Sequence, residues 1–395
     1  MIERRRQLLA AACCVVVVVL PGGLLGIVAG CASTAVTANP EAHGFKSVCF
    51  PPPPTSPRVI HLRSFNSLSD LVPRRFSFVE LVRGRPIGAH VGTPAGIAFH
   101  DGHLYICDTS INAVHDWDLS SGEARRIGLS GDGVLAKPVA VAVDEGATLY
   151  VADTVLAEVV AFDATGRLTA RYAPPDRKQY KPVAVAVRSS QLFVADIAAH
   201  RVDVFSAAES VASPLVGDAS SQRRHPQGVA LPRRGEHLAS FGRPGSELGE
   251  FYFPMGLAMD PDGSFLVSDM MNGRLQRFDS GHTAIAALGR LGDRYGDMGR
   301  PRHLAVGPDG VIFIADTQFA HIHLVNRQGQ LLMLMGGPED QPGGTPMPVG
   351  VAVAPTLPQK LASLVPTGFE ASYFLFTANT IGTKRISLFA VGSTR

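Results

Sequence analysis

The sequence predicts an all-β fold, a six-bladed β-propeller, because six stretches of similar sequence follow one another along the chain. Five of them carry a proline, then an apolar run, then an aspartate 14 or 15 residues later in a Val/Ile-Ala-Asp type signature, and a large apolar residue nine positions further on. The prolines are Pro94, Pro138, Pro182, Pro254 and Pro301, the aspartates are Asp108, Asp153, Asp196, Asp269 and Asp316, and the apolar residues are Trp117, Phe162, Phe205, Phe278 and Val325. The sixth copy starts at Pro348 and has Asn379 in place of the aspartate. Tandem repeats of this length indicate a propeller or a solenoid.

Each copy has the pattern of one antiparallel sheet of four strands. In the fourth copy, four short apolar runs are separated by the turn sequences Pro-Asp-Gly, Met-Asn-Gly and Asp-Ser-Gly, which favour hairpin connections. The copies are spaced by 44 to 47 residues, which is typical of one propeller blade. The last strands of four blades are predicted at residues 168–172, 236–241, 284–288 and 331–335.

The third and fourth copies are separated by 72 residues instead of 44 to 47. Pro226 falls near the expected phase of a further repeat, but no Val-Ala-Asp signature follows it. We therefore interpret residues 207–234 as an insertion in the third blade, and a degenerate seventh blade is the weaker alternative. The insertion is basic, and its Arg223, Arg224, Arg233 and Arg234 are candidate docking residues, although a solvated loop would have the same composition.

The two ends of the repeat region are expected to close the ring together. Residues 385–389 form the third strand of the sixth copy, and no fourth strand follows them. An isolated apolar stretch, residues 59–65, precedes the first copy. Pairing of these two segments would complete the sixth blade and remove an exposed sheet edge.

The N-terminus has the pattern of a lipoprotein signal peptide. Arg4, Arg5 and Arg6 precede a run of 13 apolar or small residues, and Val-Ala-Gly-Cys at residues 28–31 resembles the cleavage box in which the cysteine thiol carries the lipid. We expect a signal peptide over residues 1–30, lipidation (palmitate) of Cys31, a flexible, proline-rich tether over residues 31–57, and the propeller over residues 58–395. An uncleaved membrane anchor is the alternative, and both place the propeller outside the cytoplasm.

Charge and cysteine content exclude several classes of function. Without residues 1–30, which hold three arginines and Glu3, the chain has 33 basic and 33 acidic side chains, so nucleic acid is not an expected partner. Cys49 and Cys107 are the cysteines left after Cys31, and a disulfide between them is an unfavoured option. The sequence has no Cys-x-x-Cys, so zinc-ribbon and thioredoxin-like chemistry have no support.

The repeat resembles the NHL repeat over residues 90–390. The pattern Pro-x-Gly-x-Ala-x, Asp-Gly, Leu/Phe-x-Val-x-Asp and Asn-Gly-Arg-Leu-Gln-Arg-Phe carries this likeness, and the copies at residues 201–205 and 274–278 show it best. The resemblance implies a six-bladed propeller, in agreement with the count of repeats. RNA binding, which occurs in cytosolic NHL proteins, does not fit export and a neutral charge.

The repeated aspartates are predicted to be structural, because a catalytic carboxylate is needed once or twice rather than once per blade. Each is expected to accept backbone N–H bonds at the end of its strand. His303 is the histidine expected to reach the mouth of the central channel, where it lines a pocket rather than binding zinc, because catalytic zinc requires three protein ligands. His321 and His323 face the same side of a strand but have no third ligand, so we predict no catalytic residue, metal or cofactor.

These observations favour an exported, lipid-anchored propeller that acts as a non-catalytic scaffold for a protein, peptide or other ligand at the cell envelope. Its lipid is expected to hold it at the membrane. If the host has two membranes, we expect the outer membrane, with the propeller facing the periplasm, because residue 32 is Ala and not the aspartate that retains lipoproteins in the inner membrane. The alternative is a calcium- or zinc-dependent hydrolase or lyase with its site in the central channel. Three converging carboxylate, Asn or His side chains there would favour the enzyme, and a hydrophobic rim would favour the scaffold.

Overall fold

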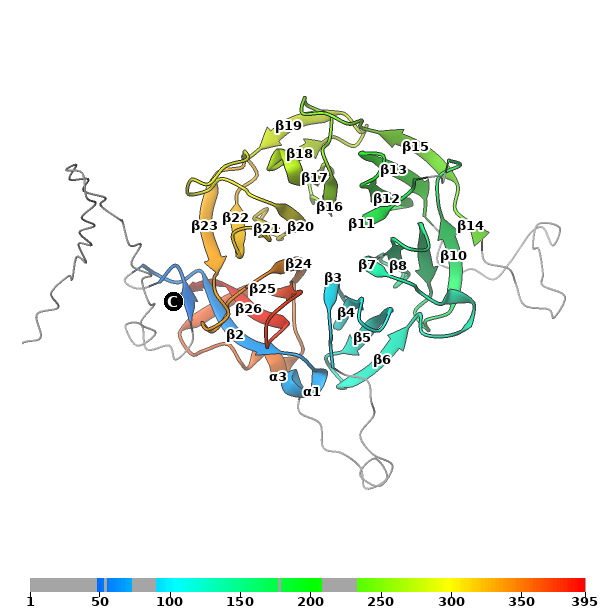
Figure 1. Cartoon of the computed structure of the whole chain (residues 1–395). Helices are drawn as coiled ribbons and strands as arrows, with labels where there is room; N and C mark the ends of the chain where they lie inside the picture. Colours follow the sequence, from blue (N-terminus) through cyan, green and yellow to red (C-terminus); the bar gives the residue numbers. More distant parts are fainter. Residues whose placement is uncertain (1–47, 53–54, 73–89, 177–178, 208–232, 395) are drawn as a thin grey trace, which may run out of the picture. The chain divides into compact units, whose positions relative to one another are not determined.

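The computed structural model describes residues 48–52, 55–72, 90–176, 179–207 and 233–394. Within them, six small antiparallel sheets stand around a central axis, which confirms the six-bladed β-propeller (Figure 1). No helix in the described part of the chain is long and apolar enough to cross a membrane. The predicted signal peptide with Cys31, and Arg223 and Arg224, lie outside these residues.

The blades are numbered in chain order, and each runs from an inner to an outer strand. Blade 1 contains β3 (Pro94–His100), β4 (His103–Asp108), β5 (Ala113–Asp118) and β6 (Glu123–Ile127), and blade 2 contains β7 (Pro138–Val143), β8 (Leu149–Asp153), β9 (Glu158–Phe162) and β10 (Leu168–Tyr172). Blade 3 contains β11 (Pro182–Arg188), β12 (Gln191–Asp196), β13 (Arg201–Ser206) and β15 (His237–Phe241), and blade 4 contains β16 (Pro254–Met259), β17 (Phe265–Asp269), β18 (Arg274–Phe278) and β19 (Ala284–Leu288). Blade 5 contains β20 (Pro301–Val306), β21 (Ile312–Asp316), β22 (His321–Val325) and β23 (Leu331–Gly336).

Blade 6 is built from both ends of the described chain. Its strands in sheet order are β24 (Pro348–Ala354), β25 (Phe369–Asn379), β26 (Ile386–Thr394), β2 (Val59–Phe65) and β1 (Cys49–Phe50). The antiparallel pairing of β2 with β26, in which Phe65 lies opposite Ile386, confirms the predicted closure of the ring. Two short helices, α1 (Leu68–Leu71) and α3 (Gln359–Ala362), lie beside this blade (Figure 1).

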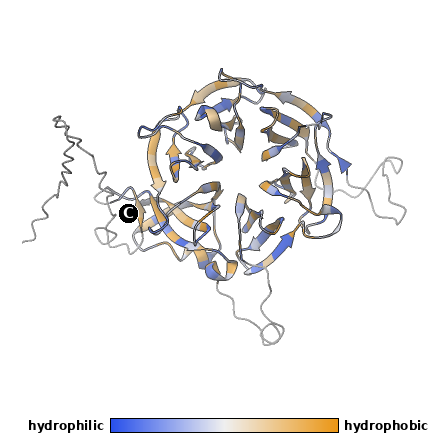
Figure 2. Cartoon of the chain, viewed as in Figure 1, coloured by the Kyte–Doolittle hydropathy of each residue, from blue (hydrophilic) through white to orange (hydrophobic). Residues whose placement is uncertain are grey.

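The sequence explains why these strands form. Each inner strand begins with a proline, and the first residue of a strand tolerates a missing N–H. Asp101 and Gly102 join β3 to β4 with φ angles of 42° and 80°, which are the two positive angles that a tight hairpin turn of this kind requires. Hydrophobic segments recur in the strands of every blade (Figure 2).

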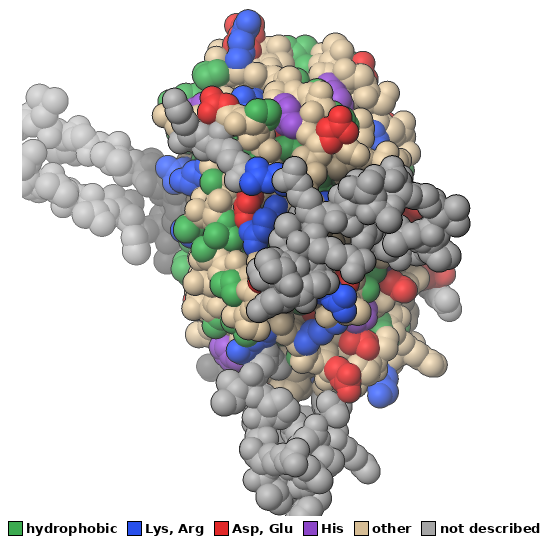
Figure 3. Space-filling model, turned by 90° about the vertical axis from the view of Figure 1, so that its right-hand side faces the viewer, with side chains coloured by type: hydrophobic (Ala, Val, Ile, Leu, Met, Phe, Trp, Pro, Cys, Tyr) green, Lys and Arg blue, Asp and Glu red, His purple; other side chains and the backbone are tan. Residues whose placement is uncertain are grey.

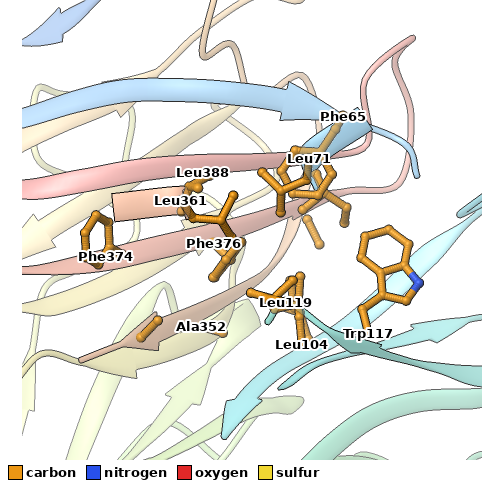
Figure 4. Packing of buried hydrophobic residues seen from close by; sticks show 14 of the residues in the cluster. Phe65, Leu71, Leu104, Trp117, Leu119, Ala352, Leu361, Phe374, Phe376 and Leu388 are labelled. Carbon is orange, nitrogen blue, oxygen red and sulfur yellow. The ribbon is translucent and has the colours of Figure 1, made fainter. Parts of the chain in front are cut away.

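The core consists of layers between neighbouring blades rather than one central cluster. The large apolar residues that follow the repeated aspartates by nine positions are all at most 2% exposed, from Trp117 in blade 1 to Val325 in blade 5. The layer between blades 6 and 1 contains Phe65 from β2, whose ring lies 6.2 Å from that of Trp117 (Figure 4). The closing strand therefore contributes a buried side chain as well as backbone hydrogen bonds.

Two short strands were not expected from the sequence. β1 adds an edge to blade 6, so Cys49, which lies within the segment assigned to the tether, is buried against the propeller. β14 (Arg233–Arg234), at the end of the insertion, pairs in parallel with β10 and adds a fifth strand to blade 2. Cys49 and Cys107 are both free thiols in separate clusters of the core.

The propeller has two unlike faces, and strand direction defines them. Successive strands of a blade run in opposite directions, so the turn from the second to the third strand and the connection to the next blade lie on the same face. The repeated aspartates stand at the ends of the second strands, on this face. We call it the staple face, and the face with the remaining turns the opposite face.

Candidate functional site

The repeated aspartates join each second strand to the connection that leads into the same blade. All five are at most 1% exposed, and each accepts one or two backbone N–H bonds of 2.7 to 3.1 Å from the two residues before the blade's first proline. The donors are Gly92 and Thr93 for Asp108, Ala136 and Lys137 for Asp153, Lys181 for Asp196, Tyr252 for Asp269, and Gly299 and Arg300 for Asp316. The predicted structural role is confirmed.

Blade 6 lacks this arrangement. Asn379 is fully buried, and neither its Oδ1 nor its Nδ2 has a hydrogen-bond partner among the described residues. The residue two positions before the first proline of this blade is Pro346, which has no N–H to donate. Loss of a donor and loss of the charged acceptor therefore occur in the same blade.

The surroundings of Asp108 and Asp196 shift the pKa values of these two aspartates in opposite directions. Burial would raise the pKa of Asp108, but hydrogen bonds from His115, Ser110 and the backbone lower it well below its usual value. For Asp196, burial outweighs its backbone hydrogen bonds, and the pKa is raised. Asp196 is held by backbone N–H groups without a histidine or arginine partner among the described residues.

The side chains that line the central channel are mostly apolar, while backbone atoms of the inner strands give it a largely polar surface. It has a cavity volume of about 280 Å³ and is lined by the inner strands β3, β7, β11, β16, β20 and β24. Among the described residues of this lining, His303 is the one with a polar side chain, and the others are Ala, Val, Leu, Ile, Met or Phe. In the described part of the chain, no three His, Cys, Asp or Glu side chains converge as a metal site.

His303 and the preceding Arg302 lie where β20 begins, at the staple-face end of the channel. Burial, and to a smaller extent the charge of Arg302, lower the pKa of His303 to about 4, so its imidazole is neutral at pH 7. Burial also lowers the pKa of Arg302, but an arginine remains charged at pH 7. His303 was predicted from the sequence, whereas Arg302 was not, although the other copies have Ala, Val or Met at the position of Arg302.

His321 and His323 take part in the structure of blade 5. His323 is buried, with Nε2 3.5 Å from a carboxylate oxygen of Asp316, and His115 has the same place beside Asp108 in blade 1 at 3.1 Å. Both histidines follow the start of a third strand by two residues. His115 and His323 therefore each lie next to the strand-end aspartate of their own blade.

The staple face carries most of the exposed apolar side chains. Among the described residues, twelve large apolar side chains are exposed, and nine of them belong to this face. The nine are Leu129, Val134, Val155, Leu248, Tyr252, Met271, Leu291, Tyr295 and Ile381, whereas the other three, Leu238, Ile285 and Leu332, lie on outermost strands. The sequence analysis did not find this asymmetry, because it depends on which loops share a face.

Two loops of this face, residues 242–253 and 289–300, have the same internal structure. An arginine pairs with an acid seven residues later in each, Arg243 with Glu250 at 2.8 Å and Arg290 with Asp297 at 2.6 Å. Parallel bridges Pro244–Phe251 and Leu291–Met298 close both loops. Their exposed apolar residues are therefore held on shaped loops rather than on extended chain.

A second concave region lies between blades 5 and 6. It has a volume of about 500 Å³ and is lined by Arg58, Asp309, Leu332, Tyr373 and other residues of β2, β22, β23, β25 and β26. Both carboxylate oxygens of Asp309 lie 2.9 Å from the Tyr373 hydroxyl. Burial and the charge of Asp309 raise the pKa of Tyr373 far above its usual value, so this hydroxyl stays protonated and donates.

The candidate docking arginines do not all lie in the described chain. Arg233 and Arg234 are exposed on β14, at the outer edge of blade 2, away from the channel. Figure 3 shows this edge of the ring, where basic and acidic side chains are interspersed. Arg223 and Arg224 are outside the described residues.

No family model matches this chain, and no curated protein matches it. Among solved structures, it is similar to a virginiamycin B lyase from Staphylococcus aureus (10% identity, TM-score 0.48, 76% of this chain and 95% of that chain) and to a gluconolactonase from Xanthomonas campestris (15%, 0.49, 83% and 97%). It is also similar to the calcium-binding protein regucalcin from Agrobacterium tumefaciens (12%, 0.48, 77% and 91%). At such scores these likenesses identify no family, and the fold rests on the six sheets of the chain itself.

Proposed function

We propose that this chain is an exported, lipid-anchored scaffold that binds a protein partner at the cell envelope through the staple face of its propeller. The observation that carries the proposal is that, within the described part of the chain, nine of the twelve exposed large apolar side chains lie on that face. Large apolar residues gathered on one surface are typical of protein interaction sites, whereas scattered single ones need no explanation.

The contacts within this face support the proposal. The rings of His200 and Tyr252 stack with centroids 5.5 Å apart, and the Met271 N–H donates to the Tyr252 carbonyl at 3.0 Å. A Cβ placed on Gly273 would lie 2.6 Å from the Cβ of Leu291, so the next connection packs directly beside this turn. The exposed residues of blades 3 to 5 thus belong to neighbouring, touching loops.

The charge of the staple face indicates the kind of partner. Its described loops hold eight basic side chains, Lys137, Lys181, Arg243, Arg290, Arg294, Arg300, Lys384 and Arg385, and nine acidic ones, Asp70, Asp132, Asp176, Glu247, Glu250, Asp293, Asp297, Glu339 and Asp340. The described part of this face is nearly neutral and therefore gives no attraction to nucleic acid. An apolar patch with interspersed charges of both signs suits another protein.

The alternative function, a metal-dependent hydrolase or lyase, would need ligands converging in the channel. The described lining supplies His303, while the strand-end aspartates are occupied by backbone N–H groups. Turnover of lactone or amide substrates by the purified protein, dependent on calcium or zinc, would support this alternative.

A photo-crosslinking amino acid at Leu291 tests the scaffold proposal, and Ile285 provides a matched control. Both are aliphatic residues of blade 4 and its outgoing connection, 57% and 52% exposed, but only Leu291 is on the staple face. In the intact host cell, we expect a discrete crosslinked protein from position 291 and none from position 285. Equal crosslinking at both positions, or none at 291, would contradict the proposal.

A further inference from the structure

Arg302 is a cation without a counter-ion at the inner end of blade 5. Its Nε is enclosed and has no hydrogen-bond partner, and no carboxylate lies within ion-pair distance of it among the described residues. Other arginines of the core are paired: Arg277 lies 2.9 Å from Asp260, and Arg274 lies 3.0 Å from Asp269. A partly buried, unpaired charge is costly, so a functional reason for Arg302 is expected.

The backbone fixes the place of this side chain. Ser268 of blade 4 donates its hydroxyl to the Arg302 carbonyl at 2.5 Å, and a Cβ on Gly256 would lie 2.2 Å from the same oxygen. Between the pairs Pro301–Asp316 and Leu304–Ile314, Arg302 and His303 together face the single residue Ala315. This is a β-bulge, and a register shift at the same place opens the inner strand of every other blade, so the bulge belongs to the repeat while Arg302 and His303 are particular to blade 5.

Apart from His303, the side chains that line the channel are apolar, and polar backbone atoms of the inner strands make up much of the rest of its surface. Arg302 adjoins the lining at His303 and is not itself one of the lining residues. His303 lines it, and its neutral imidazole can donate one hydrogen bond. One fixed positive charge matches a ligand with one negative charge, and a dianion such as phosphate would leave a buried negative charge unpaired. A volume of about 280 Å³ accommodates a short apolar chain.

We propose that Arg302 and His303 bind the carboxylate of a ligand whose apolar part occupies the central channel. A peptide C-terminus with an apolar last residue and a free medium-chain carboxylic acid share this chemistry. This inference rests on the proposed function, because the carboxylate would belong to a partner that binds the staple face and inserts this group into the central channel.

Direct binding of small probes to the propeller, measured by calorimetry, tests this assignment. We expect octanoate to bind with a dissociation constant of about 1 mM or tighter, and 1-octanol to bind about 10-fold more weakly because it has no charge. N-acetyl-Ala-Leu and its C-terminal amide form a second pair. Tighter binding of the acid peptide than of octanoate would identify the peptide C-terminus as the source.

Arg302→Met is the decisive variant, because Met255 occupies the same position in blade 4 and shows that the fold accepts this side chain. We expect this variant to lose octanoate affinity about 10-fold and to have a melting temperature no lower than that of the wild type, because the unpaired charge is removed. Arg126→Met is the control, since Arg126 also has an unpartnered Nε but lies on the outermost strand of blade 1. Equal binding of octanoate and octanol, or of wild type and Arg302→Met, would overturn the assignment.

Failure of this inference can be distinguished from failure of the proposed function. If Arg302→Met abolishes neither probe binding nor crosslinking from position 291, the scaffold remains and the carboxylate site is wrong. If probes bind through Arg302 but position 291 gives no crosslink, the channel site stands without a protein partner on the staple face.

Discussion

A buried aspartate stabilises this fold only when the donors around it outweigh its desolvation. Asp108 is surrounded by backbone N–H groups, the Ser110 hydroxyl and His115, and its pKa is lowered. Asp196 has the same place in blade 3 but receives backbone N–H groups alone, and its pKa is raised. Two identical residues in equivalent positions are therefore expected to contribute differently to stability.

Asp108→Asn should lower the free energy of unfolding by about 2 kcal/mol at pH 7, because it removes charge-assisted hydrogen bonds. Asp196→Asn should cost less than about 1 kcal/mol, because ionisation of Asp196 is already unfavourable in the fold. Denaturant unfolding of both variants measures the difference. Equal losses for the two substitutions would show that the surrounding donors do not matter.

The effect of Asp108 should depend on pH. Its folded pKa lies below the ordinary value of 3.8, so the ionised form stabilises the fold fully above that value. As the pH falls below about 4, the unfolded chain takes up the proton first and this contribution is progressively lost. The stability gap between wild type and Asp108→Asn should therefore narrow between pH 5 and pH 2.

Asn379→Asp should destabilise the protein, although it restores the residue of the other five blades. The new carboxylate would be buried where Pro346 supplies no N–H, at a cost of about 2 kcal/mol. Pro346→Ala should recover part of the loss in the double variant but gain nothing alone. A double-mutant cycle of thermal unfolding measures this coupling, and independent effects of the two changes would refute the explanation.

At the level of elements, closure depends on a few contacts between the ends of the repeat region. The Ser64 hydroxyl lies 2.8 Å from that of Ser387, and the Arg385 N–H donates to the Asn66 side chain at 2.7 Å. Without β2, the edge of β26 would be unpaired and Trp117 would lose the ring of Phe65. An unpaired strand edge of this kind is a template for pairing with another chain.

A chain that begins at residue 66 should therefore fail to form a stable monomer. A chain that begins at residue 48 keeps β1 and β2, and one that begins at residue 56 loses β1 alone. We expect both of these to unfold cooperatively in solution and the chain from residue 66 to aggregate on size-exclusion chromatography. Cooperative unfolding of the shortest chain would show that β2 is dispensable.

At the level of the whole molecule, the two faces of the propeller have different chemistry. On the opposite face, Arg277 and Arg327 both lie 2.9 Å from oxygens of Asp260, which links blades 4 and 5 through charge. The described turns of that face contain none of the twelve exposed large apolar residues. The exposed apolar side chains of the described chain thus mark the staple face, rather than the opposite face, as the docking surface.

The proposed lipid anchor gives a further prediction for the whole chain. In the native host, Cys31→Ser should move the protein from the membrane fraction to the soluble envelope fraction and abolish labelling by a palmitate analogue. Cys49→Ser is the control, since Cys49 is a buried free thiol. Retention of the Cys31→Ser protein in the membrane fraction would favour the uncleaved anchor instead.

The number of blades, most strand boundaries and the closing strand could be predicted from the sequence. Residues 168–172 and 284–288 coincide with β10 and β19, because apolar alternation and turn residues are local signals. β1 and β14 were missed, since two-residue strands carry no periodicity, and the partner of β14 also lies far away in the chain. Of the candidate site, His303 was predicted to reach the channel, but the absence of a counter-ion for Arg302 was not visible in the sequence.

The sequence by itself determined the ring: repeated prolines, aspartates and apolar residues specify blades that can bury their surfaces only against one another. The tertiary structure decided where function is to be sought. Loops that are more than a hundred residues apart, such as those of Val155 and Leu291, share the staple face only because the ring closes. Among the described residues, Arg302 has no charged partner because of its surroundings in space, which no pattern along the chain encodes.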